Sequence, residues 1–133
     1  MAGIGRTVLS LRFFGEDLQP DELTQLLGAQ PTQSHIKGDL SPSGRTQRTG
    51  AWWLRMEDRE PGDLEAQVVS LFAGLTDDLA VWADLNARYQ GDVFCGLFME
   101  SANEGLGLTP EMLLMIGQRG LRLGLDLYDP VSD

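Results

Sequence analysis

Residues 7–14 read Thr-Val-Leu-Ser-Leu-Arg-Phe-Phe, and they alternate between two kinds of side chain. Leu9, Leu11 and Phe13 leave on one side of an extended chain, and Ser10 and Arg12 leave on the other. Successive side chains of a β-strand point to opposite faces of its sheet, so this pattern predicts a strand with one apolar face. Similar runs occur at residues 51–57, 93–99 and 121–128. Their apolar faces predict one shared core.

The opposite faces of these four strands are rich in aromatic and arginine side chains. If the strands lie in one sheet, eight such residues share a surface: Arg12, Phe14, Trp53, Arg55, Phe94, Phe98, Arg122 and Tyr128. Aromatic residues beside arginine are typical of protein-binding hot spots. We therefore hypothesise a non-enzymatic interaction protein that uses this surface to form a homodimer or to bind a protein partner. Two alternatives stay open: other segments cover the face, or it holds a small ligand.

Helix signals occur between the predicted strands. Proline or a capping side chain marks each start, and glycine is the typical residue at a helix end. These signals predict helices over residues 20–27, from Asp63 to a break near Gly74, over residues 77–89, and from Thr109 to Gly120. Residues 33–38 form a weaker strand candidate, and residues 39–50 are typical of a loop. Gly91 and Asp92 predict a turn just before the alternating run at residues 93–99.

The order of these elements determines the expected fold class. Strands and helices are mixed without a regular βαβ alternation, and the strands have two different faces. We therefore expect an α+β fold with a mainly antiparallel sheet of four to five strands, helices packed on one face and a ferredoxin-like variant of that arrangement. A length of 133 residues fits a single domain over residues 1–133.

Five short motifs follow one another along residues 7–128. They are Leu9-x-Leu11-x-Phe13-x-Gly15, Leu18-x-Pro20-x-x-Leu23-x-x-Leu26-Leu27-Gly28-x-x-Pro31-Thr32, Lys37-Gly38-Asp39, Gly50-x-Trp52-x-Leu54 and Leu125-x-Leu127-Tyr128. In this order they resemble a bacterial family called domain of unknown function 4279. The resemblance implies a bacterial, single-domain α+β protein with no established activity, and it carries over no catalytic residue.

The distribution of charge suggests a second site. The net charge is −10, which disfavours binding to the phosphate backbone of nucleic acids. The segment 37–55 nevertheless holds four basic residues and only one acidic residue. Our alternative hypothesis is a small anionic-ligand-binding protein or enzyme with a site around residues 35–53. Its candidate residues are His35, Lys37, Arg45 and Arg48.

Residue types that carry catalysis or bind metals are scarce. His35 is the only histidine and Cys95 the only cysteine, so zinc sites of the usual kinds are not expected. Cys95 falls on an apolar strand face, where burial disfavours the reactive thiolate. We expect no metal, no cofactor and no catalytic residue, and this favours a protein that is not an enzyme.

The same features bear on location. A lone cysteine fits a reducing compartment, and no apolar run approaches the ~20 residues that cross a bilayer. The first residues lack the pattern of a signal peptide. We expect a cytoplasmic protein without membrane contact. By analogy, a small acidic cytosolic chain of this kind could be an immunity-type protein that neutralises a basic toxin.

Overall fold

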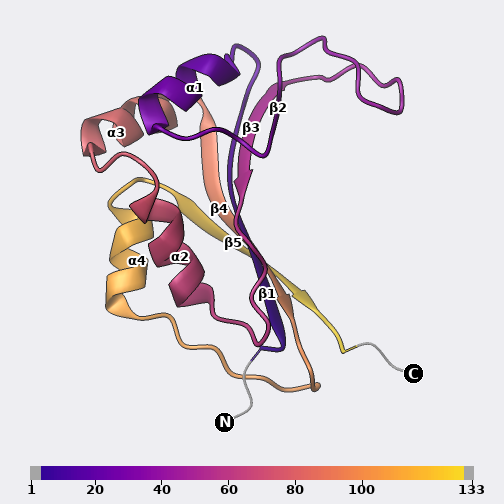
Figure 1. Cartoon of the computed structure of the whole chain (residues 1–133), viewed down its shortest axis with the longest axis vertical. Helices are drawn as coiled ribbons and strands as arrows, with labels where there is room; N and C mark the ends of the chain where they lie inside the picture. The colour runs from indigo at the N-terminus through magenta and orange to yellow at the C-terminus, as the bar shows by residue number, and fades with distance from the viewer. Residues whose placement is uncertain (1–3, 131–133) are drawn as a thin grey trace.

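The helices lie together on one face of a sheet (Figure 1). A computed structural model describes residues 4–130, and all counts below refer to that part of the chain. Its strands are β1 (Arg6–Gly15), β2 (Gln33–His35), β3 (Gly50–Arg55), β4 (Gln90–Phe98) and β5 (Arg122–Tyr128). Its helices are α1 (Pro20–Leu27), α2 (Leu64–Ala73), α3 (Leu79–Arg88) and α4 (Pro110–Gly117).

The five strands form one sheet in the order β2-β3-β1-β4-β5. β1 is antiparallel to β3 and β4, and β2 is antiparallel to β3. β5 is parallel to β4, because α4 carries the chain back before β5 begins. The α+β class and the mainly antiparallel sheet are therefore confirmed. The ferredoxin-like detail is not confirmed.

The core lies between the sheet and the helices. Leu9, Leu11 and Phe13 of β1 have no exposed surface, as their alternating positions in the sequence predicted. Trp52 of β3 is also fully buried, and its Nε1 donates a hydrogen bond to the Thr24 hydroxyl on α1 at 3.1 Å. Burial of large apolar side chains in this layer is the main force that holds the helices on the sheet.

The helix boundaries follow their capping signals closely. α1 spans the predicted residues, and Gly28 ends it in the left-handed conformation with a φ of 83°. The Asp63 carboxylate accepts from the Ala66 amide at the start of α2. The predicted break near Gly74 is confirmed, but α3 begins after the cap Asp78, later than expected.

The turn predicted at Gly91 and Asp92 was wrong, because both residues lie inside β4. Gly91 is directly opposite Phe13 of β1. A Cβ atom at Gly91 would lie 2.5 Å from the Phe13 ring, so glycine is needed here for a close approach and does not mark a turn.

Residues 36–49, here called the arm, connect β2 to β3. The sequence predicted a loop over residues 39–50, and the structure shows a two-stranded ribbon with its own backbone hydrogen bonds. The Gly38 amide donates to the Gln47 carbonyl at 2.9 Å, and the Gln47 amide donates to the Asp39 carbonyl at 2.7 Å. The arm extends away from the helices, beyond the end of the sheet (Figure 1).

Candidate functional site

The face of the sheet that points away from the helices is here called the open face. The strand register places all eight predicted aromatic and arginine residues on it. Arg12 is directly opposite Trp53 on one side and Asp92 on the other, and Asp92 is opposite Arg122. Directly opposite residues project to the same face, so these side chains form one row across four strands.

Arg12 is fixed at the centre of the open face. Its Nε donates to Asp92 Oδ1 at 2.9 Å, and its Nη2 donates to Asp92 Oδ2 at 2.8 Å. The guanidinium also lies 4.2 Å from the centre of the Phe94 ring. The hydrogen bonds to Asp92 raise the pKa of Arg12 above its ordinary value. Arg12 therefore stays charged and holds one geometry.

A second cluster occupies the other end of the open face. The rings of Phe98 and Tyr128 stack with their centres 4.5 Å apart. The Arg6 guanidinium lies 4.0 Å from the Phe98 ring centre. Arg6 and Arg55 both form ion pairs with Asp58, at 3.1 and 3.0 Å. Phe94 and Phe98 are half-buried as a result, since arginines of the same face lie over their rings.

Sequence reasoning missed three residues of the open face: Arg6, Asp58 and Asp92. Arg6 has the same parity as Arg12, but we expected the first strand to start one residue later. Asp92 was assigned to a turn. Extending the predicted strands toward their N-terminal ends would have included Arg6 and Asp92. Asp58 follows β3, and no pattern in the sequence indicated its position.

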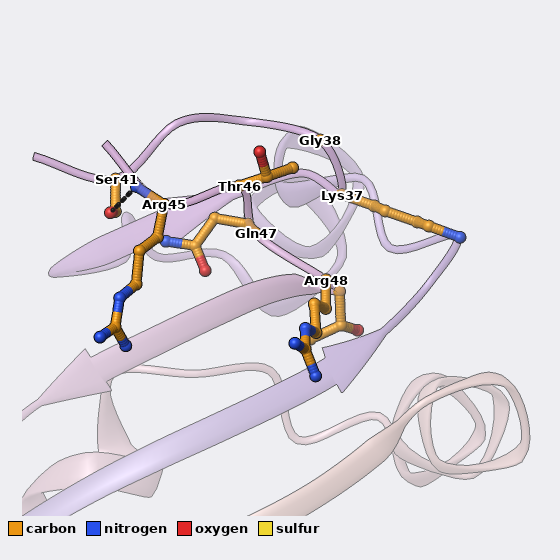
Figure 2. Close-up of a pocket in the computed structure, with 8 residues that line it drawn as sticks. Lys37, Gly38, Ser41, Arg45, Thr46, Gln47 and Arg48 are labelled. Carbon is orange, nitrogen blue, oxygen red and sulfur yellow. Dashed lines mark hydrogen bonds between the residues drawn. The ribbon is translucent and has the colours of Figure 1, made fainter. Parts of the chain in front are cut away.

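The arm brings together three of the four residues predicted for an anion site. Lys37, Arg45 and Arg48 line one cavity of about 1150 Å³. Figure 2 shows Arg45 and Arg48 extending to the same side of the arm, whereas Lys37 extends in a different direction. In the described part of the chain, neither arginine forms an ion pair, and Lys37 has only a 3.4 Å contact with Glu16.

His35 does not join this cavity. It lies in β2 opposite Ala51 of β3, and it lines a separate cavity with Gln33 and Asp39. The predicted anion site is therefore reduced to Lys37, Arg45 and Arg48.

Positive charge is concentrated on the open face and the arm. Of the ten Lys and Arg residues, seven lie there: Arg6, Arg12, Lys37, Arg45, Arg48, Arg55 and Arg122. The helices of residues 4–130 carry five acidic residues and only Arg88 as a base. The open face also carries Asp58, Asp92 and Asp126, and the arm carries Asp39, so the net charge of these eleven residues is +3 (7 − 4) in a chain whose net charge is −10.

Residues 4–130 contain neither a cluster of metal-binding side chains nor a reactive thiol. That range holds no group of three or more His, Cys, Asp or Glu side chains that is able to bind a metal ion. Cys95 is buried, and this burial raises its pKa to about 12, far from a reactive thiolate at neutral pH. Within the same range, no helix has the length and apolar character to cross a membrane.

Comparison with known proteins gives a family match. A family model described as "Domain of unknown function (DUF4279)" matches residues 6–130. Neither the curated proteins nor the solved structures contain a match to this chain. The matched range covers all five strands, the arm and all four helices of the described structure.

Proposed function

This chain belongs to the DUF4279 family of domains of unknown function, and we propose that it is a non-enzymatic binding protein for an acidic segment of a partner protein. The partner lies along the open face and reaches the arm. The observation that carries this proposal is the location of seven of the ten basic residues on these two surfaces of a chain with a net charge of −10.

The geometry of the aromatic residues supports the same function. The guanidinium groups of Arg6 and Arg12 lie against aromatic rings and are held by aspartates. These side chains are already ordered before a partner binds, so binding costs little of their conformational entropy. Such preorganisation increases affinity. Arg55 is half exposed although it pairs with Asp58, so it still presents positive charge that attracts an acidic segment.

Arg45 and Arg48 of the arm form no ion pair within residues 4–130. Thr49 lines both the arm cavity and a neighbouring cavity that includes Phe14, so the two surfaces adjoin. An extended acidic segment that contacts the open face near Phe14 therefore has Arg48 within the adjoining cavity. Long-range attraction between such charges raises the association rate and weakens with added salt.

A pair of matched peptides tests this function. A fluorescent peptide of alternating Glu and Tyr serves as the acidic probe, and an alternating Lys and Tyr peptide of equal length is its control. We expect the acidic probe to bind, with an affinity that falls as salt rises, and the basic probe to bind more weakly at the open face. Arg55→Ala on the open face and Arg48→Ala on the arm each weaken binding of the acidic probe.

Arg59→Ala is the matched control variant, because Arg59 is exposed and is paired opposite Thr7, whose side chain contacts α2 on the helical side. It leaves the affinity for the acidic probe unchanged. Equal loss of affinity in Arg55→Ala and Arg59→Ala would mean that the open face is not the binding surface. Failure of the wild-type protein to bind the acidic probe at low salt would reject the proposal as a whole.

A second candidate function is binding of a small anion at the arm cavity. Arg45 and Arg48 line one cavity, extend to the same side of the arm and form no ion pair within residues 4–130, and this arrangement favours it. Pyrophosphate and citrate are suitable probes, and ligand binding to the native state raises Tm. The expected shift disappears in the double variant Arg45→Ala/Arg48→Ala and persists in Arg55→Ala. No shift with either probe in the wild-type protein would exclude such a site for these anions.

A further inference from the structure

β5 is an open edge of the sheet with unpaired backbone groups. The Tyr128 carbonyl accepts from the Met99 amide on the β4 side. Because successive residues of a strand direct their backbone groups to alternate sides, the N–H and C=O groups of Leu123, Leu125 and Leu127 point outward. No segment of residues 4–130 pairs with that side, since β4 is the one neighbour of β5.

This edge lacks the features that usually prevent edge-to-edge pairing. Protected edges are short, or carry lysine, proline or a bulge. The opposite edge, β2, has three residues, whereas β5 has seven and contains neither lysine nor proline. An edge of this length and composition is a template for another strand.

Apolar side chains beside the same edge are exposed. Leu125 is 38% exposed and Leu127 is 63% exposed, although both point to the helix side of the sheet. α4 packs on β5 and α2, and its Leu113 and Leu114 are also exposed. A partner strand along β5 removes part of this apolar surface from water, which stabilises the complex.

The two charges of β5 identify the partner and its register. Arg122 and Asp126 have opposite signs and both lie on the open face. Neither forms an ion pair within residues 4–130. In an antiparallel pair of two β5 strands centred on Gly124, each Arg122 is directly opposite the partner's Asp126. Leu123 is then opposite the partner's Leu125, and the backbone groups of both residues point toward the seam.

A register centred on Leu125 has no such complementarity. It places Asp126 opposite the partner's Gly124, and it leaves both charges without a partner of opposite sign. In the register centred on Gly124, the Arg122 and Asp126 positions are non-hydrogen-bonded pairs, in which side chains approach most closely. Opposite charges at directly opposed positions stabilise a sheet, and like charges destabilise it.

We propose that β5 is a dimerisation strand, and that two copies of this chain pair antiparallel about Gly124 to give one continuous sheet. The symmetry is twofold, so both Arg122–Asp126 pairs form at once. The two open faces then form one surface. This inference goes beyond the proposed function and does not depend on it, because it concerns the edge of the sheet and not the occupant of the open face.

Charge-reversed variants test the proposal through sedimentation velocity. The wild-type protein is expected to be a dimer. Arg122→Glu places a carboxylate opposite the partner's Asp126 at both symmetry-related positions, and Asp126→Arg places two guanidinium groups opposite each other in the same way. Each variant alone is expected to weaken dimerisation by more than about tenfold in Kd, since like charges are now directly opposed.

Mixing the two variants makes the test specific for this register. In a heterodimer of Arg122→Glu with Asp126→Arg, both cross-strand pairs have opposite charges again. We expect the equimolar mixture, and also the double variant R122E/D126R, to recover dimers. This recovery shows in addition that each variant is folded. Arg55→Glu, a reversal on the open face away from β5, is the control and stays dimeric.

Three results would overturn the proposal. They are a monomeric wild-type protein at its highest soluble concentration, single variants that dimerise as tightly as the wild type, and a mixture of the two variants that stays monomeric. None of these results bears on binding of the acidic peptide probe, so the two proposals fail independently.

Discussion

Arg12 and Asp92 form a two-point ion pair that joins β1 to β4 on the open face, with N–O distances of 2.9 and 2.8 Å. About a quarter of the Arg12 side chain and a fifth of the Asp92 side chain are exposed. The pair therefore combines good geometry with partial shielding from water. Such pairs contribute more than fully exposed ones.

Replacing Asp92 is expected to destabilise the fold. In Asp92→Asn, the Arg12 guanidinium loses its carboxylate partner, and we expect a loss of about 1–2 kcal/mol in the free energy of unfolding. Urea denaturation measures this change. The control is Asp84→Asn, which breaks the exposed pair with Arg88 on α3 and is expected to cost less than about 0.5 kcal/mol. Equal losses would show that the Arg12–Asp92 pair contributes no more to the free energy of unfolding than an exposed ion pair does.

Gln67 of α2 anchors the helix layer to β1 through buried hydrogen bonds. Its Nε2 donates to the carbonyls of Thr7 and Glu57 at 3.0 and 2.9 Å, and its Oε1 accepts from the Thr7 hydroxyl at 2.7 Å. Gln67→Ala leaves these groups without partners, so we expect a loss of about 2–3 kcal/mol. Chemical denaturation compares Gln67→Ala with Gln25→Ala, a variant at an exposed site. A smaller loss of unfolding free energy in Gln67→Ala than in Gln25→Ala would contradict this role.

Gly50 permits a close approach of backbone segments at the start of β3. A Cβ atom at this position would lie 2.9 Å from the carbonyl oxygens of both Gly15 and Leu18. Backbone atoms cannot move aside easily, so we expect Gly50→Ala to cost about 1–3 kcal/mol. At Gly74 the nearest atom is 3.7 Å from the added carbon and φ is −90°. Thermal unfolding should therefore show a lower Tm for Gly50→Ala and little change for Gly74→Ala.

Cys95 is expected to be unreactive in the folded protein. Burial raises its pKa to about 12. At pH 8 a disulfide reagent such as Ellman's reagent should not label the native protein, and it should label the chain fully in urea. Above the ordinary thiol pKa of about 8.5, the unfolded chain loses this proton first, so rising pH lowers the contribution of Cys95 to stability. Rapid labelling under native conditions would contradict the burial of the thiol.

Much of the fold could be predicted from local signals in the sequence. The alternation at Leu9 and Leu11 defined the buried face of β1, and Pro20 and Gly28 defined α1. These signals succeed because side-chain periodicity and capping are local properties of the chain. The parallel direction of β5 could not be predicted, since alternation at an edge strand is the same in parallel and antiparallel pairing.

The candidate sites were partly predictable for the same reason. Membership of the open face follows from parity within each strand, so its eight residues were grouped correctly. The pairing of Arg12 with Asp92 depends on the register between β1 and β4, and register has no local signal here. His35 was placed with Arg45 and Arg48 because they are near in sequence, but the arm folds on itself and directs them into different cavities.

The central claim is that the open face and the arm bind an acidic protein segment. The most direct test is a ¹⁵N NMR titration of the protein with the alternating Glu and Tyr peptide, because it reports on every backbone amide. We expect the perturbed amides to cluster in β1, β3, β4, β5 and residues 36–49, with α1, α2 and α4 unchanged. Perturbations confined to the helices, or none at saturating peptide, would contradict the claim.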